Sequence, residues 1–312
     1  MRCAILINRK AGTVLSRGAR AVVESLRRQA KDAGAAVEIR LLHPASMELA
    51  LERARSDASY DAVIVGGGDG SISSAAALFA DSDKPLGILP LGTMNLFARS
   101  LRIPIDLDKA LTALLTAEPA AVDLCCVNGR VFTHHVALGL HPTILRKRET
   151  LPYRGRIGKI WASLRAYFHA LRRPPTLSLA TKIDGKTSHR RTSTLVVSNN
   201  SFIEGLGHLP YAENPQGGHL AIYVANSRNR RDLLRLSSAV AMGAWVKNPL
   251  LESHIAEEAE IALRRRRSVL ASVDGELIGL ASPLHIAIRK GALIALMPKA
   301  AEDARAENRK IA

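Results

Sequence analysis

A glycine-rich segment with one carboxylate is the part of this sequence best suited to chemistry. Residues 61–73 read DAVIVGGGDGSIS, so an apolar run enters a set of glycines and an apparent helix follows. Free backbone N–H groups at a helix N-terminus bind phosphate, and glycines let the backbone approach it closely. A tight strand-to-helix turn capped by Ser71 explains the glycines equally well. The glycines alone therefore predict either a phosphate site or a plain turn.

Asp69, which lies among these glycines, favours the phosphate site. A carboxylate beside a phosphate is repulsive unless a divalent cation or a proton-bearing group lies between them. A metal-bound nucleotide accounts for this arrangement. No lysine follows the glycines and their spacing differs from the dinucleotide fingerprint, so the segment is neither a P-loop nor a typical dinucleotide-binding motif.

The elements around this segment alternate between strand and helix. Short apolar runs at 2–7, 37–41, 61–65 and 86–89 predict strands, whereas helical spacing of apolar residues predicts helices over 14–30, 47–54 and 107–115. Such alternation indicates an α/β domain over residues 1–122 with a doubly wound, mostly parallel sheet.

After residue 122 the pattern changes to strands that are joined by short turns. Asn128-Gly129 and Asp184-Gly185 each lie between alternating apolar segments, which is the strongest local signal of a β-hairpin. We therefore expect an antiparallel β-rich domain over residues 123–292. We expect a nucleotide cleft between the two domains.

Helical inserts are predicted in the second domain at 155–171 and 231–246. One face of the first helix collects its large apolar residues, Ile157, Ile160, Trp161, Leu164 and Phe168.

Composition limits the compartment and the partners. The net charge of +16 attracts anionic polymers or anionic membranes, and an aromatic content of 4% argues against a stacking platform for single-stranded nucleic acid. No apolar run approaches the ~18 residues of a membrane-spanning helix. The cysteines, Cys3, Cys125 and Cys126, form no C-x-x-C motif and read as small buried residues in a reducing compartment. We expect a cytoplasmic protein, and the sequence does not indicate its oligomeric state.

Basic clusters occur at 146–148, 172–173, 228–231 and 264–267. Each cluster alone reads as a solvated face. Together they favour peripheral association with anionic membranes over binding to nucleic acid, because polybasic surface attracts anionic lipid by ~1 kcal/mol per residue.

Four short motifs, in order along the chain, resemble the family of diacylglycerol and sphingosine kinases. Gly67-Gly68-Asp69-Gly70-Ser71 is similar to G-G-D-G-[TS], which NAD kinases also carry. The segment NRKAG at 8–12 resembles N-P-x-[SA]-G, and PLGTMNLFAR at 90–99 resembles P-x-G-T-x-N-D-F-A-R. The segment VDGE at 273–276 resembles the late D-G-E. The resemblance spans nearly the whole chain.

This resemblance implies an ATP-dependent lipid kinase whose second domain, residues 123–292, would hold the lipid acceptor. It also implies that a strand at 293–298 returns to the first domain, which residues 293–312 would complete. The resemblance further assigns roles to residues. The residues implied to bind ATP are Asn8, Arg9, Lys10, Ala11, Gly12, Gly67, Gly68, Asp69, Gly70, Ser71, Ile72, Ser73, Thr93 and Asn95. Asp274 would accept the proton of the lipid hydroxyl, Glu276 would contact nucleotide or metal, and Mg²⁺ would arrive with ATP. The dipeptide Asp274-Gly275 by itself reads as a hairpin turn.

Several positions depart from the family pattern. Leu96 replaces the usual Asp after the Asn of G-T-x-N, and Arg9 replaces the opening Pro. Residues 214–219 read NPQGGH where relatives often have the Asp-Gly of a structural magnesium site, so no protein-held metal is assigned. His43 stands where some relatives place a nucleotide-contacting Thr, but it reads equally as an exposed loop histidine.

His134 and His135 are expected on opposite faces of a strand and therefore do not form a metal site.

Three interpretations of the function stay open. The main rival to a lipid kinase is a soluble NAD kinase, and a third hypothesis is a non-catalytic nucleotide-binding homologue. The G-T-x-N-x-F-A-R motif and the basic surface favour the lipid kinase. The sequence does not identify the lipid.

Overall fold

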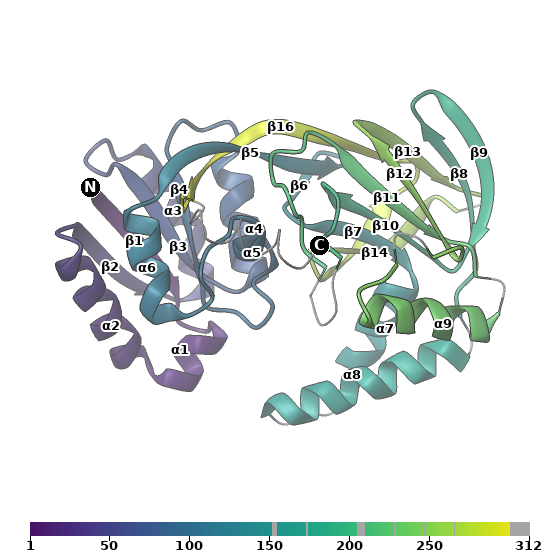
Figure 1. Cartoon of the computed structure of the whole chain (residues 1–312), viewed down its shortest axis with the longest axis horizontal. Coiled ribbons are helices and arrows are strands. Elements are labelled where there is room, and N and C mark those ends of the chain that lie inside the picture. The colour runs from purple at the N-terminus through teal and green to yellow at the C-terminus, as the bar shows by residue number, and fades with distance from the viewer. Residues whose placement is uncertain are drawn as a thin grey trace, which may run out of the picture. The chain divides into compact units, whose positions relative to one another are not determined.

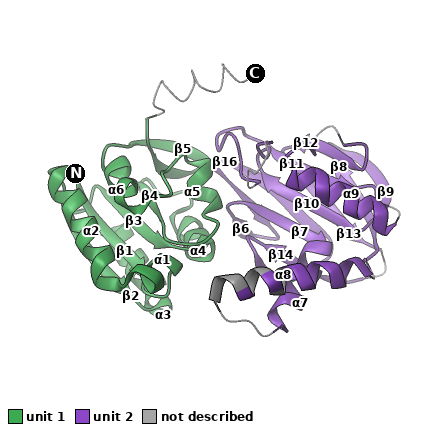
Figure 2. Ribbon diagram, turned by 60° about the horizontal axis from the view of Figure 1, so that its bottom comes forward, with its two compact units in different colours: residues 1–122, 291–312 green, residues 123–290 purple. Residues whose placement is uncertain are grey.

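The computed structural model describes residues 1–151, 155–172, 174–204, 210–227, 229–245, 248–264 and 266–299. Of the residues named above, Arg173, Arg228, Arg265 and 300–312 lie outside the described residues, as do the side chains of Ile157 and Ile160. The chain divides into two compact units (Figure 2). Met1–Val122 and a returning segment from Gly291 form the first unit, and Asp123–Lys290 form the second.

A parallel sheet in the order β2-β1-β3-β4 forms the centre of the first unit. Its strands are β1 (Arg2–Asn8), β2 (Ala36–Leu42), β3 (Ala62–Gly67) and β4 (Leu86–Pro90). The last part of β16 (Leu284–Met297) extends this sheet, because Ala295 pairs with Leu86 in parallel. β1 and β3 are almost wholly buried, which explains why they read as continuous apolar runs.

Two pairs of helices cover the sheet of the first unit (Figure 1). α2 (Ala19–Asp32) packs against α6 (Leu107–Leu115), and α3 (Pro44–Ser56) packs against α4 (Asp69–Phe79). The β1–α2–β2 and β2–α3–β3 connections run in opposite directions across the sheet. Because such crossovers are right-handed, the two pairs lie on opposite faces. The predicted doubly wound α/β architecture is confirmed.

The single helix predicted over 14–30 is wrong, because two helices occupy this range. α1 (Gly12–Arg17) ends and α2 begins at Gly18, whose φ of 87° is a conformation that glycine adopts without strain. Leu15 is exposed, whereas Val22 and Leu26 are fully buried. Apolar spacing alone does not reveal this change of direction.

The second unit is antiparallel and β-rich, as predicted, and its strands form a sandwich of two sheets. One sheet has the order β12-β11-β10-β7-β14-β15, and the other contains the first part of β16 followed by β13, β8 and β9. Side chains from both sheets form one core that includes Val197, Ile222 and Ile261. The strands are β5 (Glu118–Val127), β6 (Arg130–Phe132), β7 (His135–Gly139), β8 (Leu177–Ile183), β9 (Lys186–Thr192), β10 (Thr194–Asn199), β11 (Leu220–Ala225), β12 (Leu251–Ala256), β13 (Glu258–Leu263), β14 (Ser268–Val273) and β15 (Glu276–Ala281).

Both predicted hairpins are confirmed. Val127 pairs with Arg130 around Asn128-Gly129, and β8 pairs with β9 around Asp184-Gly185. All four turn residues have positive φ, as the two-residue turn of twisted strands requires.

Helices α7 (Leu140–Glu149), α8 (Gly155–Arg172) and α9 (Arg230–Ala241) belong to the second unit. α9 ends before the predicted 246, because Gly243 adopts a φ of 67° and the N–H of Ala244 turns back to the carbonyl of Ala239. Cys3 and Cys125 are buried as expected, whereas Cys126 is only half-buried.

Candidate nucleotide site and hairpin carboxylate

Three loops of the first unit meet at the carboxyl ends of β1, β3 and β4. The side-chain amide of Asn8 donates to the hydroxyl of Ser71 at 2.9 Å, which joins the first loop to the second. The N–H of Thr13 donates to the carbonyl of Leu91, and the N–H of Leu91 donates to the carbonyl of Gly67, each at 3.0 Å. Neighbouring parallel strands end at the same edge, so motifs far apart in sequence form one loop cluster.

Asp69 is the first residue of α4, and its carboxylate binds the loop after β4. Oδ1 accepts the N–H of Leu96 at 2.7 Å, and Oδ2 accepts the N–H of Asn95 at 3.1 Å. The carboxylate therefore holds the start of α5 (Leu96–Ser100) beside α4. Because protein donors contact both oxygens, this carboxylate has stabilising partners without a cation.

Asn95 closes the loop after β4 on itself. Its φ is 52°, its Oδ1 accepts the N–H of Gly92 at 2.8 Å, and its Nδ2 donates to the carbonyl of Gly92 at 3.2 Å. The Asn95 side chain is buried, so it positions the loop. Thr93 is exposed and available to a ligand.

Close packing requires two of the glycines in the loop cluster. A Cβ at Gly67 would lie 2.6 Å from the Cβ of Ser71, and a Cβ at Gly92 would lie 2.6 Å from the Cα of Gly68. A Cβ at Gly68 would meet nothing closer than 3.6 Å, which is ordinary contact. Packing therefore does not require glycine at position 68. A ligand that approaches the backbone closely at this position would require it.

The other predicted residues of the first unit also lie in this loop cluster, but they contribute in different ways. Arg9 and Lys10 are exposed, so their cationic side chains can meet an anion. Ala11 and Ile72 have buried side chains and can offer only backbone groups. Gly12, Gly70 and Ser73 are half-buried at the starts of α1 and α4.

This loop cluster can bind phosphate groups. The first N–H groups of an α-helix have no partner inside the helix, and the helix dipole places positive potential there. α4 begins immediately after Gly68, its N-cap. Backbone donors and two nearby cationic side chains thus share one edge of the sheet.

Asp274 is both a turn residue and a hydrogen-bonded carboxylate. Val273 pairs with Glu276 around it, and its φ is 47°, so the hairpin interpretation is correct. Oδ2 accepts the backbone N–H of Thr133 at 2.8 Å and its hydroxyl at 3.0 Å. Oδ1 accepts the N–H groups of His134 at 2.9 Å and His135 at 3.0 Å. The carboxylate thereby fixes the β14–β15 hairpin to the start of β7.

The expectation that His134 and His135 lie on opposite faces is wrong. Their Nδ1 atoms are 2.5 Å apart, and the His134 ring stacks on Phe202 with ring centres 4.9 Å apart. His134 precedes the first residue of β7, so strand alternation does not apply to it. Burial lowers the pKa of His134, and burial with the neighbouring His134 lowers the pKa of His135 to about 3.

His141 of α7 completes this group, because its ring centre lies 5.2 Å from that of His135. Burial, followed by the nearby His135 and Arg148, lowers the pKa of His141 to about 3. The three rings are therefore neutral at pH 7.

Glu276 and His43 lie on the surfaces of their units. Glu276 is half-exposed and contacts Arg130 at 3.2 Å, a surface ion pair that contributes little to stability. His43 is exposed at the N-cap of α3, where its Nδ1 accepts the N–H of Ala45 at 3.4 Å.

A buried polar network around Asp123 is not predicted by the sequence patterns. Its Oδ2 accepts the N–H of Gly218 at 2.7 Å and the side-chain amide of Asn200 at 3.1 Å. Asn199 donates to the Asp123 carbonyl at 2.8 Å. A charged residue inside the apolar run 122–127 was the available signal. Among the described residues, no group of three or more His, Cys, Asp or Glu side chains is placed to hold a metal ion.

Comparison with known proteins connects both units to one class. Residues 2–127 match the family model of the diacylglycerol kinase catalytic domain, and residues 158–297 match that of the YegS C-terminal NAD kinase beta sandwich-like domain. A protein named "Putative lipid kinase" from Staphylococcus epidermidis is 26% identical over 73% of this chain and 74% of its own length. A "Probable lipid kinase YegS-like" from Yersinia pestis is 35% identical over 43% of this chain and 46% of its own length.

The crystal structure of a "putative diacylglycerol kinase" from Bacillus anthracis has the same fold. Its TM-score is 0.76 at 19% identity, and the match covers 95% of each chain. The sequence comparison thus connects residues 2–127 to the diacylglycerol kinase catalytic domain, and the solved structure shows that the fold of the chain is shared.

Proposed function

We propose that this protein is an ATP-dependent lipid kinase that transfers the γ-phosphoryl group to a lipid hydroxyl. The observation that carries the proposal is the loop cluster at the carboxyl ends of β1, β3 and β4. The Asn8–Ser71 hydrogen bond and the carboxylate of Asp69 hold these loops beside the N-terminus of α4. The relatives named as lipid kinases support the choice of acceptor.

The residues of this loop cluster fit a magnesium ion that arrives with ATP better than one held by the protein alone. Carboxylate oxygens are preferred Mg²⁺ ligands, but backbone donors already contact both oxygens of Asp69. When bound, Mg²⁺ neutralises charge on the phosphates. The protein would contribute the backbone N–H groups of α4, the side chains of Arg9 and Lys10, and the fixed position of the loops.

Asp274 is the proposed proton acceptor. Backbone N–H groups of Thr133, His134 and His135 hold the carboxylate in one orientation. The Thr133 hydroxyl also donates to Oδ2, and because this hydroxyl can rotate, a substrate hydroxyl can replace it as donor. General-base assistance of this kind contributes roughly 10²–10⁴-fold in rate.

Two observations support other functions. The second unit matches a domain model described as NAD kinase beta sandwich-like, which keeps NAD as an alternative acceptor. The occupation of Asp69 and Asp274 by protein donors, together with Leu96, favours a nucleotide-binding protein without catalysis.

One assay separates the three functions. Purified protein is incubated with labelled ATP, Mg²⁺ and either NAD or a lipid panel of diacylglycerol, a sphingosine-like base, ceramide and phosphatidylglycerol. A lipid kinase transfers label to the organic phase with at least one lipid, and label in NADP would establish the NAD kinase. Saturable ATP binding without transfer to any acceptor would establish the non-catalytic protein.

A further inference from the structure

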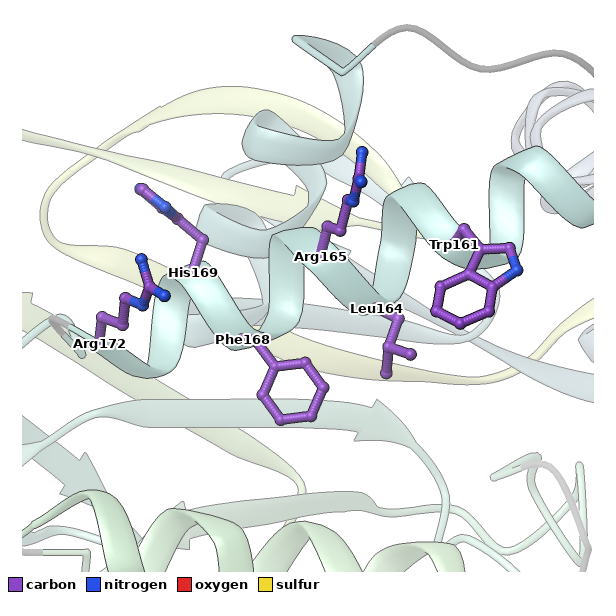
Figure 3. Close-up of a pocket in the computed structure, with 6 residues that line it drawn as sticks. All are labelled: Trp161, Leu164, Arg165, Phe168, His169 and Arg172. Carbon is purple, nitrogen blue, oxygen red and sulfur yellow. The ribbon is translucent and has the colours of Figure 1, made fainter.

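Helix α8 presents large apolar side chains to solvent. Trp161 is 61% exposed, Leu164 is 42% exposed and Phe168 is 53% exposed. Figure 3 shows these three side chains on one side of the helix, with Arg165, His169 and Arg172 along the neighbouring side. Residues three and four apart lie above one another on a helix, so each set forms a continuous stripe. We call Trp161, Leu164 and Phe168 the apolar stripe.

The apolar stripe is not needed to complete the core of the second unit. Ala166 and Ala170, on the opposite side of α8, are buried, and Ala170 forms a cluster with Leu140 of α7 and Leu233 of α9. Leu171, which follows Phe168 by about one helical turn, is buried in the same cluster, so the line of the apolar stripe meets the core only at the end of the helix. Isolated exposed apolar residues are normal, but three large ones on one stripe indicate an interaction surface.

The charges beside the stripe indicate its partner. Arg165 and Arg172 are exposed next to it, and the sequence of α8 contains no aspartate or glutamate. The six side chains that are labelled in Figure 3 line a hollow of about 370 Å³. α7, which packs along α8, ends in the basic run Arg146, Lys147 and Arg148. Trp, Leu and Phe on one side and arginine on the next are the composition of helices that lie in the membrane interface.

We propose that α8 docks this protein on an anionic phospholipid surface. The helix lies parallel to the membrane, the apolar stripe enters the boundary between headgroups and acyl chains, and Arg165 and Arg172 contact lipid phosphates. None of the described helices is long and apolar enough to cross a bilayer. The biological purpose of this docking rests on the proposed function, because a lipid acceptor lies in the membrane.

A second copy of the chain fits this surface less well. A two-fold contact would place the same surface of both copies together and would add Arg165 and Arg172 of both copies to the contact, with no carboxylate of α8 to pair with them. Like charges brought together at an interface oppose association.

Vesicle binding of the full-length chain tests the docking directly. Co-sedimentation is measured with vesicles of phosphatidylcholine alone and with added phosphatidylglycerol, without ATP. Trp161→Ser with Phe168→Ser should weaken binding to anionic vesicles by about tenfold or more. Arg165→Gln with Arg172→Gln should weaken it about fivefold per arginine at low salt and reduce its salt dependence. The matched control is Ile255→Ser, which removes a 63% exposed apolar residue of β12 in the same unit and should change nothing.

Tryptophan fluorescence locates the contact. The chain has 2 tryptophans, and Trp245 is only 4% exposed, so Trp161 should supply the response to membranes. Lipids brominated on the acyl chain should quench the emission of wild-type protein. Trp161→Phe should keep vesicle binding and lose the quenching.

Unaltered vesicle binding in the Trp161 and Phe168 double variant, with its circular dichroism unchanged, would overturn the proposal. Light scattering that shows a dimer only when the apolar stripe is intact would also overturn it and assign the surface to a second copy. Because no turnover is measured, a chain that binds vesicles but phosphorylates no lipid would refute the proposed function alone.

Discussion

The carboxylate of Asp274 accepts both the backbone N–H and the hydroxyl of Thr133, at 2.8 and 3.0 Å. Asp274 lies in the β14–β15 turn, and Thr133 lies immediately before the histidine pair that leads into β7. The positive φ of the turn residue aims its side chain at these donors. The turn and the proposed proton acceptor are therefore the same structural feature.

Asp274→Asn should reduce both stability and turnover. An amide has one acceptor oxygen, so its NH₂ group would face some of the backbone N–H donors, and unsatisfied donors cost about 1–3 kcal/mol in the free energy of unfolding. If Asp274 is the proton acceptor, kcat should also fall about 10²–10⁴-fold at a temperature where the variant remains folded.

Thr133→Val is the matched control for this exchange. It removes only the hydroxyl donor and should cost about 1 kcal/mol, while the carboxylate stays in place. Denaturant unfolding and steady-state kinetics on both variants separate the contribution of Asp274 to stability from its role as proton acceptor. Equal kcat in Asp274→Asn and wild type would assign Asp274 to the turn alone.

Asp69→Asn should weaken ATP binding by disturbing the loop cluster. One of the two contacts, to Leu96 or to Asn95, would meet the amide NH₂ instead of an oxygen, so α5 would separate from α4. Calorimetric titration with Mg²⁺ and ATP measures the affinity. Asp61→Asn serves as the control, because that exposed carboxylate also accepts a backbone N–H, from Arg2, at the amino end of β1. A loss of the same size in both variants would contradict a specific role for Asp69.

Gly92→Ala should reduce stability, whereas Gly68→Ala should reduce the affinity for ATP. A Cβ at 92 would meet the backbone of Gly68 at 2.6 Å, so Gly92→Ala should destabilise the first unit by about 1–3 kcal/mol. A Cβ at 68 meets only ordinary contacts, so Gly68→Ala should fold like wild type. It should nevertheless bind ATP more weakly if phosphates approach this backbone. Thermal unfolding with and without ATP measures both effects, and unchanged affinity in Gly68→Ala would place the phosphates elsewhere.

His141→Leu should make the protein less sensitive to acid. The pKa of His141 falls from an ordinary value of 6.5 to about 3 because the ring is buried, so between these values the unfolded chain binds a proton that the folded chain excludes. The free energy of unfolding therefore falls as pH falls from 6.5 toward 3, and the variant lacks this contribution. Unfolding is measured from pH 7.5 to 4. The control is His189→Leu, at an exposed position, which should keep the wild-type pH dependence of unfolding. If His141→Leu also kept that dependence, the buried His141 would not be a cause of the loss of stability in acid.

Local patterns in the sequence were sufficient for the class of fold. Buried parallel strands read as apolar runs, and Asn-Gly and Asp-Gly mark hairpins because their backbones tolerate positive φ. The sequence of residues 61–73 also predicts that the glycines lie between a buried strand and a helix, and Asp69 is the first residue of that helix. These features depend on neighbouring residues, so the sequence determines them by itself.

Only the tertiary structure decided what each side chain contacts. The spacing of Trp161, Leu164 and Phe168 predicts one apolar face, but their exposure depends on where α7 and α9 pack against α8. In the same way, the donors to Asp274 come from Thr133, His134 and His135, which are distant in sequence. Helical spacing and turn preference are properties of consecutive residues, whereas burial and hydrogen-bond partners arise when the chain brings separate segments together.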